Sequence, residues 1–316
     1  LIVVIVVDLS RVNLGAYHTG PLEAATFTPG LVEAIRQHAG VLGPGHFRLS
    51  SIEETEFVSR EELSRWLSPI GITSLMLRQS LDVEHNAQFQ IESSRLYLPG
   101  YNPALLSFDW QEFGIEASAQ YNVAYFIGRS FHFKSPRFAQ AFVAGLRDYD
   151  LVLVKNPVPV KPRAYLSRRP ERAASPVDLA ALVGRPDFLS GEVDVIETEE
   201  TTLPGPSRGG STVIERYAPE EVLVHVSTSE AAVLVLLDTF DAGWRATLET
   251  GVGCAIRRAN GFVRAVVVPA GDHVVTFRYQ TPLLKAGALA SLAGLVICLA
   301  LVAHAWLPRP RRSGNP

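Results

Sequence analysis

The chain has 316 residues, of which 47% are hydrophobic and 19% charged, and its formal net charge at pH 7 is −3. This length allows one large or two ordinary domains with a sizeable core. The mildly acidic balance, with no basic stripe, argues against nucleic acid as a partner. The two cysteines, Cys254 and Cys298, lie in segments of different character, so we expect no disulfide framework.

The first seven residues, LIVVIVV, are entirely apolar. A run of this length is too short to span a bilayer, and it lacks the basic region and the cleavage site of a signal peptide. A buried strand is one interpretation. We favour another, in which residues 1–9 are the end of a truncated transmembrane helix, so that the chain is the C-terminal piece of a larger membrane protein.

Residues 10–196 mix helical and strand patterns, and we predict an α+β domain outside the membrane. One predicted helix follows Pro29 and ends at Gly40, and a second runs from Ser59 to Leu67. A third begins at Ser135-Pro136, with Phe138, Phe142 and Leu146 on one face, and a fourth begins at Ser175-Pro176. The predicted strands are 46–52, 74–79, 89–91, 95–98 and 151–154.

Aromatic residues are dense between positions 97 and 133, and they include Tyr101 and Trp110. Aromatic rings next to carboxylates such as Asp109 suit sugar binding, because sugar rings present flat C–H faces together with hydroxyl groups. The same residues also suit an ordinary hydrophobic core, and both interpretations stay open. Tyr101 and Trp110 are therefore candidate ligand-binding residues.

Residues 197–211 are acidic and then rich in proline and glycine, which is typical of a linker. Beyond them the hydrophobic period changes to two, and Asn260-Gly261 is a strong hairpin signal. We predict an antiparallel β-sandwich over 212–282, with strands at 212–217, 221–228, 231–238, 245–249, 255–258, 262–268 and 273–279. The predicted fold class is thus an α+β region, a β-sandwich and one C-terminal transmembrane helix.

Residues 286–307 contain no Asp, Glu, Lys or Arg, and a helix of this length covers about 33 Å, enough for a bilayer core. We predict a transmembrane helix over 283–307 and a tail over 308–316. Arg309, Arg311 and Arg312 place that tail in the cytoplasm by the positive-inside rule. The expected location is a cytoplasmic membrane, with several crossings in the whole protein and the main domain outside.

Asp238, Asp241 and Trp244 cluster around one predicted sandwich loop. A ring flanked by carboxylates can bind sugar, although we favour Trp244 as a core residue beneath the turn. The sequence contains no G-x-S-x-G, Walker loop, H-E-x-x-H or C-x-x-C motif. We therefore assign no catalytic residue, metal ligand or cofactor.

The segment Leu234–Tyr279, followed by Pro282 and the apolar helix, resembles the C-terminus of the YfhO family of bacterial multi-spanning membrane proteins. Asn156-Pro157 with Pro162–Leu166, and Leu182–Phe188, also resemble that family. The chain departs from the family's pattern at Glu249-Thr250-Gly251, where Asp-Gly is usual, and at Lys161, where an apolar residue is commoner.

The resemblance implies a glycosyltransferase of the GT-C type, which uses a polyprenyl-phosphate-linked sugar in glycosylation of the cell envelope. Its catalytic acid would precede residue 1, so no residue here inherits a catalytic role. The implied partners are the lipid bilayer, the lipid-linked sugar and an envelope glycan. A different hypothesis is a non-catalytic, membrane-anchored envelope protein whose β-sandwich binds polysaccharide or a protein partner.

Overall fold

The structure is a computed structural model that describes residues 26–51, 69–82, 85–94, 110–207 and 209–306, together with the single residues at 23, 64, 65 and 67. Several predictions lie outside these residues: the membrane tail at 1–9, most of the connector before Pro29, most of the helix after Ser59, the strand at 95–98, Tyr101 and the tail at 308–316.

The N-terminal part is built on a mixed sheet with the order β2-β1-β3-β5-β4. Its strands are β1 (Arg48–Ser51), β2 (Glu92–Ser93), β3 (Val123–Arg129), β4 (Phe142–Leu146) and β5 (Leu151–Lys155). Strand β1 runs parallel to β2 and β3, whereas β5 runs antiparallel to β3 and β4. Because side chains alternate along β3, Tyr125 and Ile127 contact one hydrophobic cluster and Phe126 contacts another, on the opposite face.

Helices cover both faces of this sheet. The helix α3 (Gly30–Ala39) buries Leu31, Val32 and Ile35 in the cluster that contains Tyr125 and Ile127. The helix α7 (Trp110–Gln120) belongs to the cluster that contains Phe126. The other elements of this part are α5 (Pro69–Gln79), α8 (Pro136–Ala139) and the 3-10 turns at Ala87–Phe89, Ser130–Phe133 and Arg147–Tyr149.

The C-terminal part is a sandwich of two sheets, as predicted. One sheet has the order β13-β12-β16-β10-β9 and the other β6-β11-β15-β14-β8-β7. The strands are β6 (Ala164–Leu166), β7 (Arg169–Ala173), β8 (Val193–Glu197), β9 (Gly210–Ala218), β10 (Glu221–Thr228), β11 (Ala232–Thr239), β12 (Trp244–Leu248), β13 (Gly253–Cys254), β14 (Arg257–Ala259), β15 (Val263–Val268) and β16 (Gly271–Tyr279). The short helices α9 (Leu179–Val183) and α10 (Pro186–Leu189) lie between β7 and β8.

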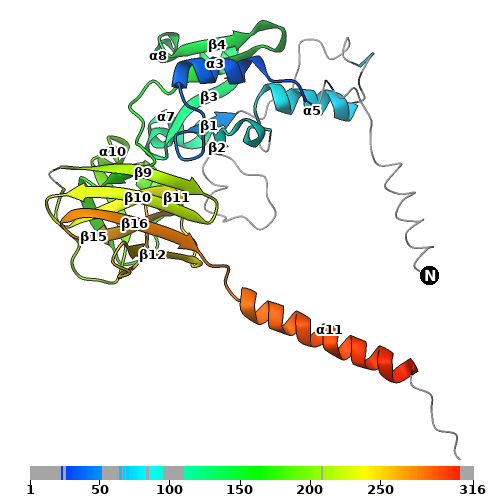
Figure 1. Cartoon of the computed structure of the whole chain (residues 1–316). Helices are drawn as coiled ribbons and strands as arrows, with labels where there is room; N and C mark the ends of the chain where they lie inside the picture. Colours follow the sequence, from blue (N-terminus) through cyan, green and yellow to red (C-terminus); the bar gives the residue numbers. More distant parts are fainter. Residues whose placement is uncertain are drawn as a thin grey trace, which may run out of the picture.

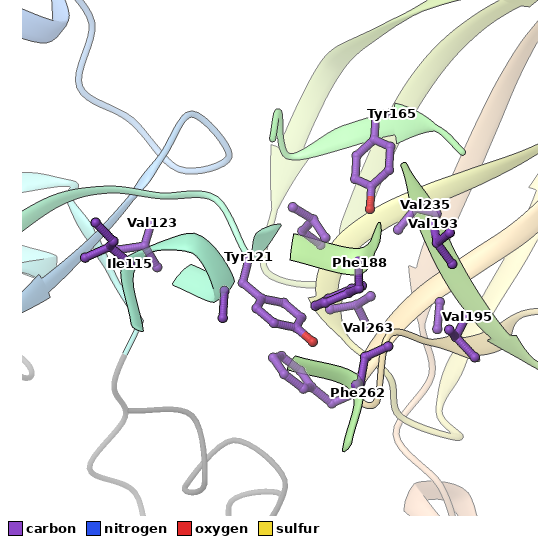
Figure 2. Packing of buried hydrophobic residues seen from close by; sticks show 14 of the residues in the cluster. Ile115, Tyr121, Val123, Tyr165, Phe188, Val193, Val195, Val235, Phe262 and Val263 are labelled. Atoms are coloured by element: carbon purple, nitrogen blue, oxygen red, sulfur yellow. The ribbon is translucent and has the colours of Figure 1, made fainter. Parts of the chain in front are cut away.

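The sandwich interior is filled by alternate residues of its long strands, which gives β10 a strictly alternating burial pattern. Val224, Leu234, Val266 and Phe277 meet there. Strand β11 is buried on both faces, because its other face packs against α7, α9 and α10. Figure 2 shows the cluster on this second face, which includes Val235 of β11 and Phe188 of α10. In the same cluster Tyr121 stacks on Phe262, with ring centroids 4.7 Å apart.

Four predictions need correction. Residues 89–91 form no strand, because Phe89 ends a 3-10 turn and Gln90 has a left-handed backbone with φ +59°, so β2 begins at Glu92. The sandwich does not begin at 212, because β6, β7 and β8 lie before the predicted linker and belong to the six-stranded sheet. Residues 74–79 are helical, since Ile72, Leu75 and Met76 form one buried helical face of α5. The predicted long helix from Pro136 ends at Ala139, and residues 142–146 form β4 instead, where β5 supplies a hydrogen-bonding partner.

The C-terminal helix α11 (Leu284–Trp306) extends away from the sandwich (Figure 1). Its stretch Leu284–Ala303 is long and apolar enough to cross a membrane, and none of it is buried in the protein. Within the described ranges, it is the one helix with these properties. A surface this apolar is unfavourable in water, so α11 anchors the chain in a bilayer, with the sandwich only residues 280–283 away.

Candidate functional site

Asp238, one of the predicted ligand-binding residues, is a buried ion-pair centre. Its carboxylate, on β11, is 2.9 Å from Arg264 Nη2 and 3.3 Å from Arg163 Nε, and it accepts a 2.8 Å hydrogen bond from the Tyr217 hydroxyl. Arg48 of β1 lies 3.5 Å from the same carboxylate and donates to the Leu237 carbonyl. The cluster therefore joins the mixed sheet to both sheets of the sandwich.

The charges in this cluster compensate for their own burial. Burial raises the pKa of Asp238, but Arg163, Arg264 and Arg48 outweigh that effect and hold the pKa below its ordinary value. Burial and the neighbouring Arg163 lower the pKa of Arg48 to about 10. Asp238 is 7% exposed and paired in this way, so its carboxylate holds strands of the three sheets together. Its predicted contact with a ligand stays a prediction.

Trp244 lines a cavity of about 560 Å³ at the end of β12, and Asp241 lines the same cavity. The guanidinium of Arg264 lies 3.8 Å from the centroid of the Trp244 ring, and the Tyr279 ring meets it edge-on at 5.2 Å. Asp241 Oδ1 accepts a 2.7 Å hydrogen bond from Gly243 N, which fixes the turn before Trp244. The remaining wall is formed by Phe240, Ala242, Arg245, Ala246, Thr247, Gly253, Cys254, Ala255, Ile256 and Gln280.

The predicted candidates thus fall into separate places. Asp241 and Trp244 share one cavity, and Trp244 also packs against the sandwich core, so both interpretations of this residue describe part of its role. Asp238 does not line the cavity but touches it indirectly, through Arg264. Trp110 is the first residue of α7, in the other half of the molecule, and Tyr101 lies outside the described residues.

A larger cavity, of about 890 Å³, lies where the segment before β6 meets α7, α10 and the start of β9. Two cationic residues, Lys161 and Arg168, line it, and the described lining contains no acidic residue. The other lining residues are Gln120, Pro159, Val160, Pro162, Tyr165, Leu166, Ser190, Gly191, Ser207, Gly209, Gly210 and Thr212. We refer to it below as the Lys161 cavity.

A fully buried carboxylate, Asp194 of β8, holds one wall of the Lys161 cavity in place. It accepts hydrogen bonds from the hydroxyls of Tyr165 (2.6 Å) and Ser167 (2.7 Å) and from Asn260 Nδ2 (2.8 Å). Lys161 Nζ lies 3.1 Å from the same carboxylate and 4.2 Å from the centroid of the Tyr165 ring. Burial lowers the pKa of Lys161, although Asp194 opposes this effect.

Sequence reasoning did not find this cavity. Lys161 stood out only as a departure from the YfhO pattern, and Asp194 was not singled out, although a carboxylate in the apolar run Val193–Ile196 was a usable signal. Among the described residues, no three or more His, Cys, Asp or Glu side chains are grouped so that they could hold a metal ion.

No protein-family model matches the chain, and no curated protein matches it. Part of it is similar to cryo-EM structures of the arabinofuranosyltransferase AftD from mycobacteria. The match has 22% identity and a TM-score of 0.26, and it covers 35% of this chain and 8% of that one. A mutant of the same protein gives 24% identity, a TM-score of 0.25 and 9% coverage of that chain. These values carry no assignment, so the resemblance to YfhO proteins stays a prediction.

Proposed function

We propose that this chain is the extracytoplasmic part, with the last transmembrane helix, of a membrane glycosyltransferase that uses a polyprenyl-phosphate-linked sugar. In this proposal the β-sandwich helps to bind the acceptor glycan of the cell envelope, and the chemistry takes place in a part of the protein that precedes residue 1. The sequence resemblance of Leu234–Tyr279 supports the class of enzyme.

One observation carries the binding role. Tyr279, which packs on Trp244, directly precedes the connector to α11, and Gln280, which lines the Trp244 cavity, is the first residue of that connector. A connector of residues 280–283 spans at most about 14 Å, so the cavity lies close to the membrane surface. An aromatic ring beside a carboxylate and several backbone groups suits a sugar. A glycan growing on a lipid carrier would be presented at that height.

The orientation can be tested in intact cells. In a Cys254→Ser background, cysteines are placed at Thr250, in an exposed turn of the sandwich, and at Asn315. We expect a membrane-impermeant maleimide to label Thr250→Cys on intact cells, and Asn315→Cys only after lysis. Labelling of Asn315→Cys from outside would overturn the orientation and the extracytoplasmic role with it.

The binding role is tested with the detergent-solubilised chain and polysaccharide extracted from cell envelopes. We expect Trp244→Ala to weaken binding several-fold or more, because an aromatic contact contributes about 0.5–1.5 kcal/mol beyond its buried area. Phe131, an exposed aromatic residue beside β3, provides the matched control as Phe131→Ala. Unchanged affinity in Trp244→Ala would remove this cavity from the binding site. Discovery of a different partner for the β-sandwich would then favour the non-catalytic alternative.

A further inference from the structure

We propose that the Lys161 cavity binds a hydroxylated ligand that carries an anionic group, a phosphate or a carboxylate, and that Arg168 and Lys161 contact that group. This site shares no lining residue with the Trp244 cavity. It goes beyond the proposed function and does not depend on it.

The charged residues in the described lining of the cavity are both cationic. Arg168 is exposed and makes no hydrogen bond or ion pair with the residues that the structure describes. Its charge also acts unfavourably on Lys161. Two cations around one cavity without an acid in its described lining attract an anion, which would relieve their repulsion.

Lys161 keeps capacity for a ligand although it is paired with Asp194. The carboxylate already accepts hydrogen bonds from three neutral donors, Tyr165, Ser167 and Asn260. An ammonium group has three N–H donors, and only one is directed at Asp194. Asp194 therefore fixes the position of the ammonium group, and the side chain of Lys161 remains 13% exposed.

The rest of the lining suits hydroxyl groups. Gln120 is 4% exposed and donates through Nε2 to the Leu189 carbonyl, but its Oε1 accepts no hydrogen bond from the described residues. A buried acceptor without a donor is unfavourable, and a ligand hydroxyl would satisfy it. Ser190, Ser207 and Thr212 add hydroxyls around the same cavity, whose volume of about 890 Å³ is large enough for a small oligosaccharide.

Gly191 makes this arrangement possible. Its φ is +77°, and a Cβ built there would lie 3.1 Å from both Gln120 Oε1 and Lys161 Cε. A side chain at this position would therefore enter the space between the two groups. Because asparagine tolerates a positive φ, Gly191→Asn fills that space with little strain in the backbone.

The test uses the full chain in detergent micelles and calorimetric titration with glucose 1-phosphate, glucuronate and neutral glucose. We expect one of the two anionic probes to bind with a Kd of about 1 mM or lower, more weakly as salt is raised, and glucose to bind at least tenfold more weakly. Preference for the phosphate or for the carboxylate identifies the anionic group.

Variants test whether the anion binds in the Lys161 cavity. We expect Arg168→Gln to weaken anion binding about tenfold, the loss of one charge-assisted hydrogen bond, and Gly191→Asn to abolish it. Lys161→Met is also expected to abolish anion binding, provided that circular dichroism shows this variant to be folded. Arg147→Gln, at an exposed arginine in the turn after β4, is the control and is expected to bind the anion like the original chain. Equal binding of glucose, no binding of either anion, or full affinity in Arg168→Gln would overturn the proposal.

Discussion

Arg264 stacks on Trp244 at 3.8 Å while its Nη2 donates to Asp238 at 2.9 Å, so one guanidinium connects the buried ion-pair cluster to the Trp244 cavity. Arg264 Nε and Nη1 are buried without hydrogen-bond partners in the described structure. The face of the indole ring therefore adds a cation–π contact to a guanidinium that is otherwise paired through Nη2.

Replacing Trp244 should consequently affect stability as well as binding. We expect Trp244→Ala to lower the free energy of unfolding by roughly 2–3 kcal/mol, less than for a fully buried tryptophan, because the ring is half-buried. Trp244→Phe keeps part of the stacking and should lower the free energy of unfolding by less than Trp244→Ala does. Urea unfolding of the chain in detergent micelles, followed by near-UV circular dichroism, measures both. Equal losses in the two variants would show that the stacking with Arg264 contributes nothing.

Asp238 should be among the most sensitive residues in the chain. We expect Asp238→Asn to cost about 3–5 kcal/mol of unfolding free energy, because the buried Arg163 and Arg264 and the partly buried Arg48 lose their shared counter-charge. Glu92, which pairs with Arg163, replaces only part of that charge. Asp150→Asn, at a partly exposed pair with Arg129, is the control and should cost about 1 kcal/mol or less. Since the pKa of Asp238 is lowered, its contribution is present above its ordinary pKa of 3.8 and is lost as the pH falls through the folded-state value. Similar losses in both variants would contradict the role of the cluster.

Asn260 offers a test that separates turn geometry from hydrogen bonding. Its φ is +47°, its Oδ1 accepts from Val195 N and its Nδ2 donates to Asp194, each at 2.8 Å. We expect Asn260→Gly, which keeps the turn, to cost roughly 2–4 kcal/mol because both bonds are lost. Asn260→Asp should cost more at neutral pH, since it sets a second carboxylate against Asp194, and should recover as the pH is lowered. Thermal unfolding at two pH values checks this. A pH-independent loss in Asn260→Asp would contradict it.

His273 and Glu249 form an exposed pair between β16 and the turn after β12, with His273 Nδ1 3.0 Å from Glu249 Oε1. The hydrogen bond to Glu249 raises the pKa of His273 above 6.5, and the same bond lowers the pKa of Glu249 below 4.5. The contribution of His273 to stability is therefore fully present below pH 6.5 and is lost as the pH rises through its folded-state pKa. The contribution of Glu249 to stability is present above pH 4.5 and is lost as the pH falls through its own folded-state pKa.

The expected outcome is that Glu249→Gln lowers the pKa of His273, as measured by NMR titration of the histidine rings. The difference in melting temperature between the original chain and this variant should be larger at about pH 5.5 than at about pH 8. The other histidines serve as internal controls, because their titration should not change. An unaltered His273 titration would mean that the pair does not form in solution.

The β-sandwich could be predicted because its strands carry their own signal. In β10, buried Val222, Val224 and Val226 alternate with partly exposed residues, and the Asn260-Gly261 turn has positive φ at both positions, as its sequence predicts. The helix predicted from the spacing of Phe138, Phe142 and Leu146 was wrong, because positions four apart share a face in a helix and also in a strand. Pairing with β5, a non-local partner, decides the outcome there.

The same distinction separates the two cavities. Asp241 and Trp244 could be grouped because they are three positions apart in one turn, and the structure keeps them together. Lys161 and Asp194 are 33 positions apart and meet only in the tertiary structure, since three strands separate β6 from β8 in the six-stranded sheet. A pattern read along the chain does not contain that pairing. It does not contain the ion pairs of Asp238 either, because its arginine partners lie on β1, on β15 and just before β6.

The short connector at residues 280–283 has a consequence for how encounters occur. A domain on so brief a tether sweeps only a thin layer of water above the lipid. Any molecule that is itself held in the bilayer then meets it by lateral diffusion, and the relevant quantity is its density per area of membrane rather than its concentration in bulk solution. Lengthening this segment with a flexible insert should dilute such encounters while leaving affinity for a soluble ligand untouched.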